Sequence, residues 1–268
     1  MNVLTHTLPV TLRQARQSRR LSQMELSMRV GVSQRHVSFV ETGRAKPSRE
    51  LLIAWLHELD APLALRNVAM LQAGYAPAYG AAAIDDPALA RANEAMVQLL
   101  QAHDPMPALV IDAQWNLLNA NRGGRWLAAT LVPWAAELPA TTPLNMLDML
   151  IHPEGFTRPM INLLEVGPSM LAHLRDEASV QPALTPKVEA FAALLRTRLG
   201  GHGLHNGWPR LMAPVLTTRF ASVHGELAFF SMFTTFGTPQ DITLASLRVE
   251  HMFAADAGTR AVIAAQVV

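Results

Sequence analysis

The sequence predicts an α+β protein, in which an all-α head of five short helices precedes a body that combines helices with an antiparallel β-sheet. Three observations support this fold class. Apolar residues recur at helical spacing over residues 8–73, turn residues gather over 74–87, and the C-terminal third is rich in strand-forming residues. We expect the domains to be residues 1–73 and 88–268, joined by a linker at 74–87.

The charge of the chain is unevenly distributed. Residues 1–66 hold 10 Lys and Arg against 5 Asp and Glu, and residues 67–268 hold 12 against 16, so the net charge of +1 hides a basic head. The absence of Cys excludes disulfides, thiolate zinc sites and cysteine nucleophiles. The apolar runs are far shorter than the roughly 20 residues that span a membrane, and no signal-peptide pattern is present. We expect a cytoplasmic protein.

The head contains the pattern of a helix-turn-helix. Ser22 and Glu25 form a capping box, and Gly31 with the second cap Ser33 marks a short turn between two helices. Two helices separated by such a glycine-containing turn are typical of DNA-binding domains. The expected helices are residues 10–18, 23–30, 34–41 and 49–59, with a fifth that ends by residue 73.

The third helix decides between a DNA-reading and a purely structural head. Val37 and Val40 point inward, whereas the outward positions are polar: Gln34, Arg35, His36 and Ser38. Arg reads guanine and Gln reads adenine in the major groove, and the start of a recognition helix reaches the bases. Phe39 either touches a thymine methyl or packs inward. The alternative interpretation is a solvated polar face; the helix spacing favours DNA recognition.

Four segments of the head carry a family signal: LRQAR at 12–16, LSQMEL at 21–26, GVS at 31–33 and ETGRAKPS at 41–48. In them the head resembles the XRE (Cro/CI-type) family of lambda-repressor-like domains. The resemblance implies that Gln23 clamps a DNA phosphate, that Arg16 pairs with Glu41, and that a dimer binds a near-palindromic operator of double-stranded DNA. Arg44 and Lys46 suit backbone phosphates, or are solvated loop charges. The predicted DNA contacts are Gln23, Ser33, Gln34, Arg35, His36, Ser38, Phe39, Arg44 and Lys46.

The body alternates helices with short strands. After a helix at 88–103, two strands within 108–121 flank a tight turn at 112–114. The remaining expected elements are helices at 122–127, 144–150 and 159–177, a loop at 132–143, and strands at 209–223, 226–235 and 243–253. Strands, helices and then antiparallel strands make an α+β plan.

Seven segments of the body carry a second family signal: PALVID at 107–112, WNL at 115–117, NANR at 119–122, IHPEG at 151–155, ELAFF at 226–230, TFGTPQD at 235–241 and AAD at 254–256. In them the body resembles the MmyB-like ligand-binding domain, a PAS-like fold that follows an XRE head in many bacterial regulators. The resemblance implies a fatty-acid-like or similar lipophilic effector. Residues 200–208, rich in Gly and His, depart from that pattern.

A PAS-like sheet with helices over one face commonly encloses a small-molecule cavity. The candidate lining is Trp115, Leu117, Met149, Met160, Leu163, Leu164, Phe229, Met232, Phe233 and Phe236, each of which is alternatively ordinary core. Alternation puts Phe229 and Phe233 on one strand face and Phe230, Met232 and Phe236 on the other, without saying which faces the cavity. Arg158 is the candidate counter-ion for an effector carboxylate.

The sequence proposes no catalytic residue, cofactor or metal. His202 and His205 form a lone pair without a third ligand, and no nucleotide loop, GxSxG or HExxH motif is present. Our first hypothesis is a homodimeric transcription regulator whose body senses an apolar molecule and shifts the spacing of the heads. The alternative is an enzyme or lipid carrier whose head is a protein-interaction module.

Overall fold

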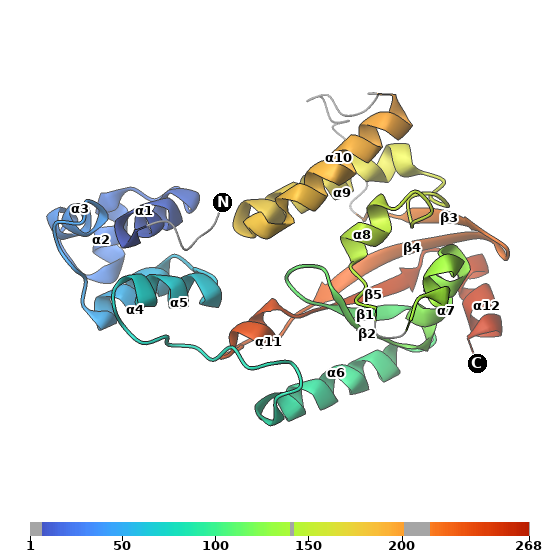
Figure 1. The fold of residues 1–268 in the computed structure, drawn as a ribbon, viewed down its shortest axis with the longest axis horizontal. Helices are drawn as coiled ribbons and strands as arrows, with labels where there is room; N and C mark the ends of the chain where they lie inside the picture. The colour runs from blue at the N-terminus through green and yellow to red at the C-terminus, as the bar shows by residue number, and fades with distance from the viewer. Residues whose placement is uncertain (1–6, 140–141, 201–214, 268) are drawn as a thin grey trace. The chain divides into compact units, whose positions relative to one another are not determined.

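A computed structural model describes residues 7–139, 142–200 and 215–267 of the chain. These residues form two compact units (Figure 1). The helical unit comprises residues 1–83 and 238–245, and the sheet unit comprises residues 84–237 and 246–268. The predicted α+β class is confirmed.

The helical unit contains the five predicted helices, whose starts and ends follow local chemistry. They are α1 (Leu8–Ser18), α2 (Gln23–Val30), α3 (Gln34–Glu41), α4 (Arg49–Glu58) and α5 (Leu63–Gln72). The capping box forms, since Ser22 and Glu25 each accept the other's backbone N–H. Ser33 and Ser48 cap α3 and α4, and Gly31 ends α2 with a φ of 71°.

The core of the helical unit is built from the apolar stripe of each helix. Trp55 of α4 is fully buried at its centre. The side chains that surround it include Leu12, Leu26, Val37, Val40, Leu52, Leu56 and Met70. Because Val37 and Val40 lie in this core, the opposite side of α3 faces outward.

The sheet unit is a five-stranded antiparallel sheet with the order β2-β1-β5-β4-β3. Its strands are β1 (Ala108–Ile111), β2 (Leu117–Ala120), β3 (Thr218–Ser222), β4 (Gly225–Thr234) and β5 (Arg248–Ala254). Its helices are α6 (Ala90–His103), α7 (Arg122–Leu131), α8 (Met146–Ile151), α9 (Leu163–Val180), α10 (Thr185–Leu199) and α12 (Ala257–Gln266). Short 3₁₀ helices occupy Pro87–Leu89, Pro133–Glu137 and Pro182–Leu184.

The two faces of the sheet are covered by different helices. In Figure 1, α8, α9 and α10 lie over one face, which we call the inner face, and α6 lies over the other. The inner face holds the large core, which includes Trp115, Leu163, Leu174, Phe191, Phe220, Leu227 and Phe229. The first hairpin joins the C-terminal strand here, since Leu109 of β1 pairs with Glu250 of β5.

The structure corrects three predicted elements. The strand expected at 243–253 begins only at Arg248, because the residues before it form the short helix α11 (Ile242–Ser246). At the start of α11 the Asp241 carboxylate accepts the N–H of Thr243 at 2.8 Å. The helix expected at 159–177 begins at Leu163, because residues 159–161 hydrogen-bond β3 instead. The loop expected at 132–143 contains a 3₁₀ helix, and α10 was not predicted. Residues 209–214 of the expected strand at 209–223 lie outside the described residues.

Candidate DNA-recognition surface and effector face

The recognition helix α3 presents polar side chains from its first turn. The Ser33 hydroxyl oxygen accepts the N–H of His36 at 3.2 Å, which fixes the start of the helix. Gln34 and Arg35 are exposed, whereas His36, Ser38 and Phe39 are half-buried. The Arg35 guanidinium lies 5.1 Å from the centre of the Phe39 ring, so Phe39 supports an arginine that is predicted to read bases.

A buried ion pair joins α1 to the end of α3. Arg16 donates to both carboxylate oxygens of Glu41, from Nε at 2.7 Å and from Nη2 at 2.9 Å. The hydrogen bond to Glu41 raises the pKa of Arg16, against the opposing effect of burial. The structure thus contains the pair that the family resemblance implies, and this pair holds α3 in place.

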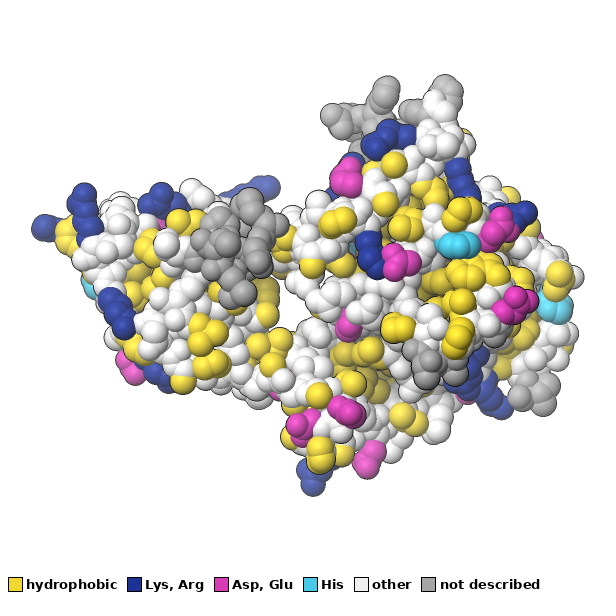
Figure 2. Space-filling model, viewed as in Figure 1, with side chains coloured by type: hydrophobic (Ala, Val, Ile, Leu, Met, Phe, Trp, Pro, Cys, Tyr) yellow, Lys and Arg dark blue, Asp and Glu magenta, His cyan; other side chains and the backbone are white. Residues whose placement is uncertain are grey.

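The three other predicted DNA contacts lie in two places. Gln23, the first residue of α2, is half-buried and donates from Nε2 to Glu41 at 2.8 Å. Arg44 and Lys46 are exposed in the loop between α3 and α4. Figure 2 shows Lys and Arg side chains on the surface of the helical unit. The roles of all nine residues in DNA contact stay predictions.

The strand register decides which aromatic side chains of β4 face the large core. Phe229 pairs with Ala254 and is buried in the inner-face core. Phe233 lies on the same face, with its ring centre 6.4 Å from that of Trp115, and remains 41% exposed. Phe230 points to the other face, where it stacks on Phe253 at 5.3 Å. Of the two faces predicted from the alternation, the one with Phe229 and Phe233 is therefore the inner face.

The predicted effector contacts fall into two groups. Four pack in or against the core of the inner face, namely Trp115, Leu117, Leu163 and Phe229, and Met149 of α8 is buried outside that core cluster. Phe233 is exposed next to Trp115, and Phe236 is half-buried away from this core, in a second hollow. Of the further lining candidates, Met160 is buried, and Leu164 and Met232 are exposed. Whether these residues touch an effector stays a prediction.

Arg158 lies apart from this aromatic cluster and forms an ion pair with Glu154 on the surface. The charged group beside Trp115 is Arg248, which sequence reasoning missed. The Arg248 guanidinium lies 5.0 Å from the Trp115 ring and 5.8 Å from the Phe233 ring. No local signal could have found it, because its partner Glu177 is 71 residues away.

Glu177 of α9 connects two side chains of the inner face, Arg248 and Trp115. Both of its carboxylate oxygens accept hydrogen bonds from Arg248, and one also accepts the Trp115 indole N–H at 2.8 Å. Burial raises the pKa of Glu177, but hydrogen bonds and charge from Arg248, with Trp115 and His173, outweigh it and lower the pKa overall. We call Arg248, Glu177, Trp115 and Phe233 the arginine cluster.

Glu250 is a second acid on the inner face of β5. Burial raises its pKa, although a hydrogen bond from Ser231 and the charge of Arg248 oppose the rise. The pKa of Glu250 is therefore raised, whereas the pKa of Glu177 is lowered. The face that carries the predicted effector contacts is thus mixed in character, with apolar side chains beside one paired and one protonation-prone carboxyl group.

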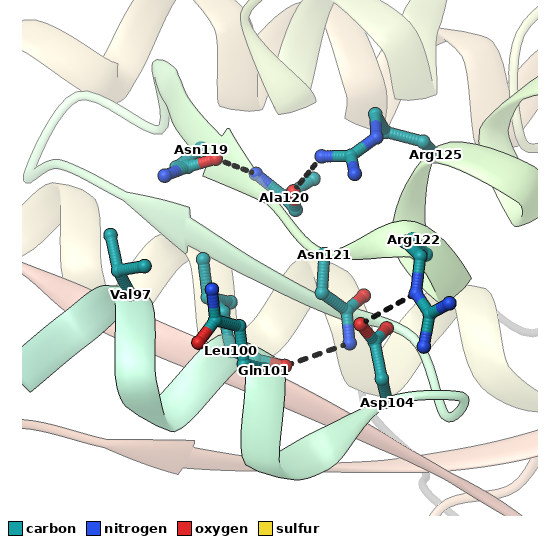
Figure 3. Close-up of a pocket in the computed structure, with 9 residues that line it drawn as sticks. All are labelled: Val97, Leu100, Gln101, Asp104, Asn119, Ala120, Asn121, Arg122 and Arg125. Carbon is teal, nitrogen blue, oxygen red and sulfur yellow. Dashed lines mark hydrogen bonds and ion pairs between the residues drawn. The ribbon is translucent and has the colours of Figure 1, made fainter.

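A polar hollow of about 380 Å³ lies between α6, β2 and the start of α7 (Figure 3). Its lining is Val97, Leu100, Gln101, Asp104, Asn119, Ala120, Asn121, Arg122 and Arg125. The side chain of Asn121 forms four hydrogen bonds with backbone groups, and Arg122 pairs with Asp104 at 3.1 Å. None of the predicted effector contacts lines this hollow.

A second hollow of about 110 Å³ lies between α6 and the end of β4. It is lined by Ala95, Met96, Leu99, Thr234, Thr235, Phe236, Leu247 and Val249. Within the described residues, no three acidic or histidine side chains form a candidate metal site, and no helix combines the length and hydropathy of a membrane span. His202 and His205, with residues 201–208 of the divergent segment, lie outside the described residues.

The matches to protein families follow the two units. Residues 12–65 match the helix-turn-helix family model, and residues 92–265 match the model of the MmyB-like transcription regulator ligand binding domain. No curated protein is significantly similar to the chain. The two matched ranges contain helix α3 and the five-stranded sheet, respectively.

Proposed function

Because the chain belongs to the MmyB-like transcription regulators, with a helix-turn-helix domain and a ligand-binding domain, we propose that it binds a near-palindromic operator as a cytoplasmic homodimer. In this proposal a small apolar effector of fatty-acid-like chemistry binds the sheet unit and alters operator binding. The effector needs only a different affinity for two states of the dimer to act in this way.

The single observation that carries the DNA-binding part is the presentation of α3. Its inward valines and the Arg16–Glu41 pair hold the helix, and its first turn leaves Gln34 and Arg35 exposed. A rigid helix with long hydrogen-bonding arms at its N-terminal end fits the major groove. Phosphate contacts from Gln23, Arg44 and Lys46 would then set its register.

The DNA-binding part is tested by selecting DNA from a random-sequence pool with the full-length protein. Arg35→Ala should weaken binding to the selected site by about 1–3 kcal/mol and relax its base preference. Arg91→Ala, an exposed arginine of α6, is the matched control. Binding should also weaken steeply as salt rises. Salt-independent binding, or no enrichment of any DNA, would leave the head as a protein-interaction module.

The effector part is supported by the apolar side chains of the inner face. Met and Phe adapt to a flexible chain, and the proposed contacts are Trp115, Leu117, Met149, Leu163, Phe229, Phe233 and Phe236. Arg158 is the proposed counter-ion, which would have to exchange Glu154 for an effector carboxylate. Native mass spectrometry with straight-chain fatty acids and the matching alcohols tests this: acids should bind better, and Arg158→Ala should remove the difference. Equal binding of acid and alcohol would exclude a carboxylate contact.

A further inference from the structure

The connection between β4 and β5 belongs to the helical unit, although both strands belong to the sheet unit. We call residues 238–245 of this connection the strap. The chain leaves the sheet unit after Gly237 and returns at Ser246, two residues before β5 begins at Arg248. The chain therefore passes between the two units three times, after residues 83, 237 and 245.

The strap is hydrogen-bonded to the end of the linker. The Asp241 carboxylate accepts the Ala82 N–H at 3.0 Å, and the Ile242 N–H donates to the Gly80 carbonyl at 2.8 Å. The Thr243 hydroxyl donates to the Ala82 carbonyl at 2.6 Å. These bonds come from backbone and side chain on both segments, so the strap and residues 80–82 form one small folded element.

Gly80 is the residue that lets the carboxylate approach. A Cβ atom at this position would lie 2.7 Å from Oδ2 of Asp241, closer than Cβ atoms come to other heavy atoms in proteins, so the carboxylate would have to move. The backbone of Gly80 has no positive φ, so alanine would be tolerated there apart from this contact. The close approach therefore depends on the missing side chain of Gly80.

The linker segment is in turn held on α5 of the helical unit. The Asn67 side chain accepts the N–H groups of Ala78 and Tyr79 at 2.9 and 3.1 Å, and donates to the Tyr79 carbonyl at 2.8 Å. The Arg66 guanidinium donates to the Tyr79 hydroxyl at 3.1 Å. A displacement of Gly80 would therefore strain the hydrogen bonds that Arg66 and Asn67 of α5 form with residues 78 and 79.

The same segment reaches the loop that follows the recognition helix. The Tyr75 hydroxyl donates to the Pro47 carbonyl at 2.9 Å, and the Lys46 ammonium lies 4.8 Å from the centre of the Tyr75 ring. Lys46 is a predicted phosphate contact. Residues 75–82 are therefore hydrogen-bonded to Asp241, to α5 and to the loop that carries Lys46.

The strands on both sides of the strap carry residues of the arginine cluster. Phe233 is the penultimate residue of β4, before the strap, and Arg248 is the first residue of β5, after it. Both belong to the cluster on the inner face, with Glu177 and Trp115. A change in the cluster would therefore alter both strand ends from which the strap emerges.

We propose that the strap transmits the state of the inner face to the DNA-binding head through the docking of Asp241 on Gly80 and Ala82. This inference rests on the proposed function, because it names how the effector face regulates operator binding. Coupling of two sites needs an element whose arrangement both sites bias, and the strap is the element that contacts the linker and continues into the cluster.

Docking is tested by hydrogen exchange on the full-length protein. Asp241→Asn keeps one oxygen to cap α11 but cannot also accept the Ala82 N–H, and Gly80→Ala blocks the approach from the linker side. Both should speed amide exchange in residues 76–83 about tenfold or more, since each lost hydrogen bond opens the segment. Asp85→Asn, the same charge change at an exposed position of the connection, should leave it unchanged. Unchanged exchange in both docking variants would overturn the docking.

Transmission is tested by a mutant cycle on the DNA site that the wild-type protein selects. Glu177→Gln removes the charge of the cluster while retaining an acceptor for Trp115. With Asp241 intact it should change DNA affinity about threefold or more, and with Asp241→Asn it should change nothing further. No effect in either background, or an equal effect in both, would overturn the proposal.

The failure of this inference is distinguishable from failure of the proposed function. If the protein selects no DNA, the proposed function falls, and exchange in residues 76–83 becomes the readout. Glu177→Gln must then alter that exchange when Asp241 is present and not when it is replaced by Asn. An exchange rate that ignores Glu177→Gln in the Asp241 protein would overturn transmission on its own.

Discussion

Each unit of the protein contains a bidentate arginine–glutamate pair, and the two pairs differ in how far their side chains are buried. Arg16 and Glu41 lie 25 residues apart, and the Glu41 side chain is fully buried. Arg248 and Glu177 lie 71 residues apart, and their side chains stay 20% and 18% exposed. The first pair is sealed inside a small helical core, whereas the second borders the partly exposed ring of Phe233.

The difference in burial gives the two ion pairs different roles. The Arg16–Glu41 pair is deeply buried and is supported by the hydrogen bond from Gln23 to Glu41, so it holds α3 against α1 and keeps the recognition helix in one position. A partly exposed pair beside aromatic rings can exchange a partner at lower cost, which suits a face that responds to a small molecule. We therefore expect α3 to be held rigidly and the Arg248–Glu177 pair to rearrange more easily. Four substitutions test it, from the largest expected effect to the smallest.

Arg16→Ala should destabilise the helical unit by about 3–5 kcal/mol, because the buried Glu41 carboxylate loses its bidentate partner and keeps only Gln23 at 2.8 Å and Arg13 at 4.0 Å. Hydrogen exchange in increasing urea, resolved by peptide, would report each unit separately. Arg29→Ala, at an exposed position of α2, is the control and should change stability by less than about 0.5 kcal/mol. A small loss for Arg16→Ala would show that the pair is not sealed.

Asn121→Ala should cost the sheet unit about 3 kcal/mol, because its buried amide both caps α7 and bonds three further backbone groups. The same urea series measures it, with the exposed Asn119→Ala of β2 as control. The expected loss depends on buried backbone partners alone. An equal effect from Asn119→Ala would point to the edge strand instead.

Glu177→Ala should destabilise the sheet unit by about 2 kcal/mol at neutral pH, less than Arg16→Ala, because water reaches the pair. The folded pKa of Glu177 is lowered, so its contribution is complete above the unfolded pKa of about 4.3. The contribution is lost as the pH falls through the lower, folded pKa. Urea unfolding at several pH values checks this, with the neighbouring exposed Asp176→Ala as control. A pH-independent difference would contradict the assignment.

Glu250→Gln should have the smallest effect and the opposite sign. The folded pKa of Glu250 is raised, so ionisation at neutral pH costs stability, and the variant should gain on the order of 1 kcal/mol. The gain should shrink as the pH falls through the raised pKa and vanish below the unfolded pKa of about 4.3. A loss of stability at neutral pH would mean that the charged form of Glu250 is needed by the inner face.

Local chemistry explains how much of the head could be predicted. Ser22, Glu25, Gly31 and Ser33 act on neighbours within a few residues, so their spacing in the sequence specifies the helices. The outward face of α3 follows from the positions of its two valines. The predicted DNA contacts on α3 therefore follow from this spacing, whereas the role of Gln23 is implied by the resemblance to the XRE family.

The sheet unit depended on contacts that no local pattern contains. Alternation separated Phe229 from Phe230, but only the pairing of β4 with β5 directed Phe229 toward the helices. The strand expected from residue 243 failed because the cap of α11 comes from Asp241, a single residue at a turn. Arg158 follows the IHPEG segment at 151–155 in the sequence, whereas Arg248 meets Glu177 and Trp115 only in the folded sheet unit.

The sequence by itself determined the two-part plan, the recognition helix and the membership of both parts in known families, because these depend on short spacings and composition. Only the tertiary structure decided which residues meet across 71 positions of chain at Glu177 and Arg248. It alone decided that the strap belongs with the helical unit, through the contact of Asp241 with Gly80 and Ala82. The physical reason is that these contacts are set by strand register and packing, which arise only when distant segments come together.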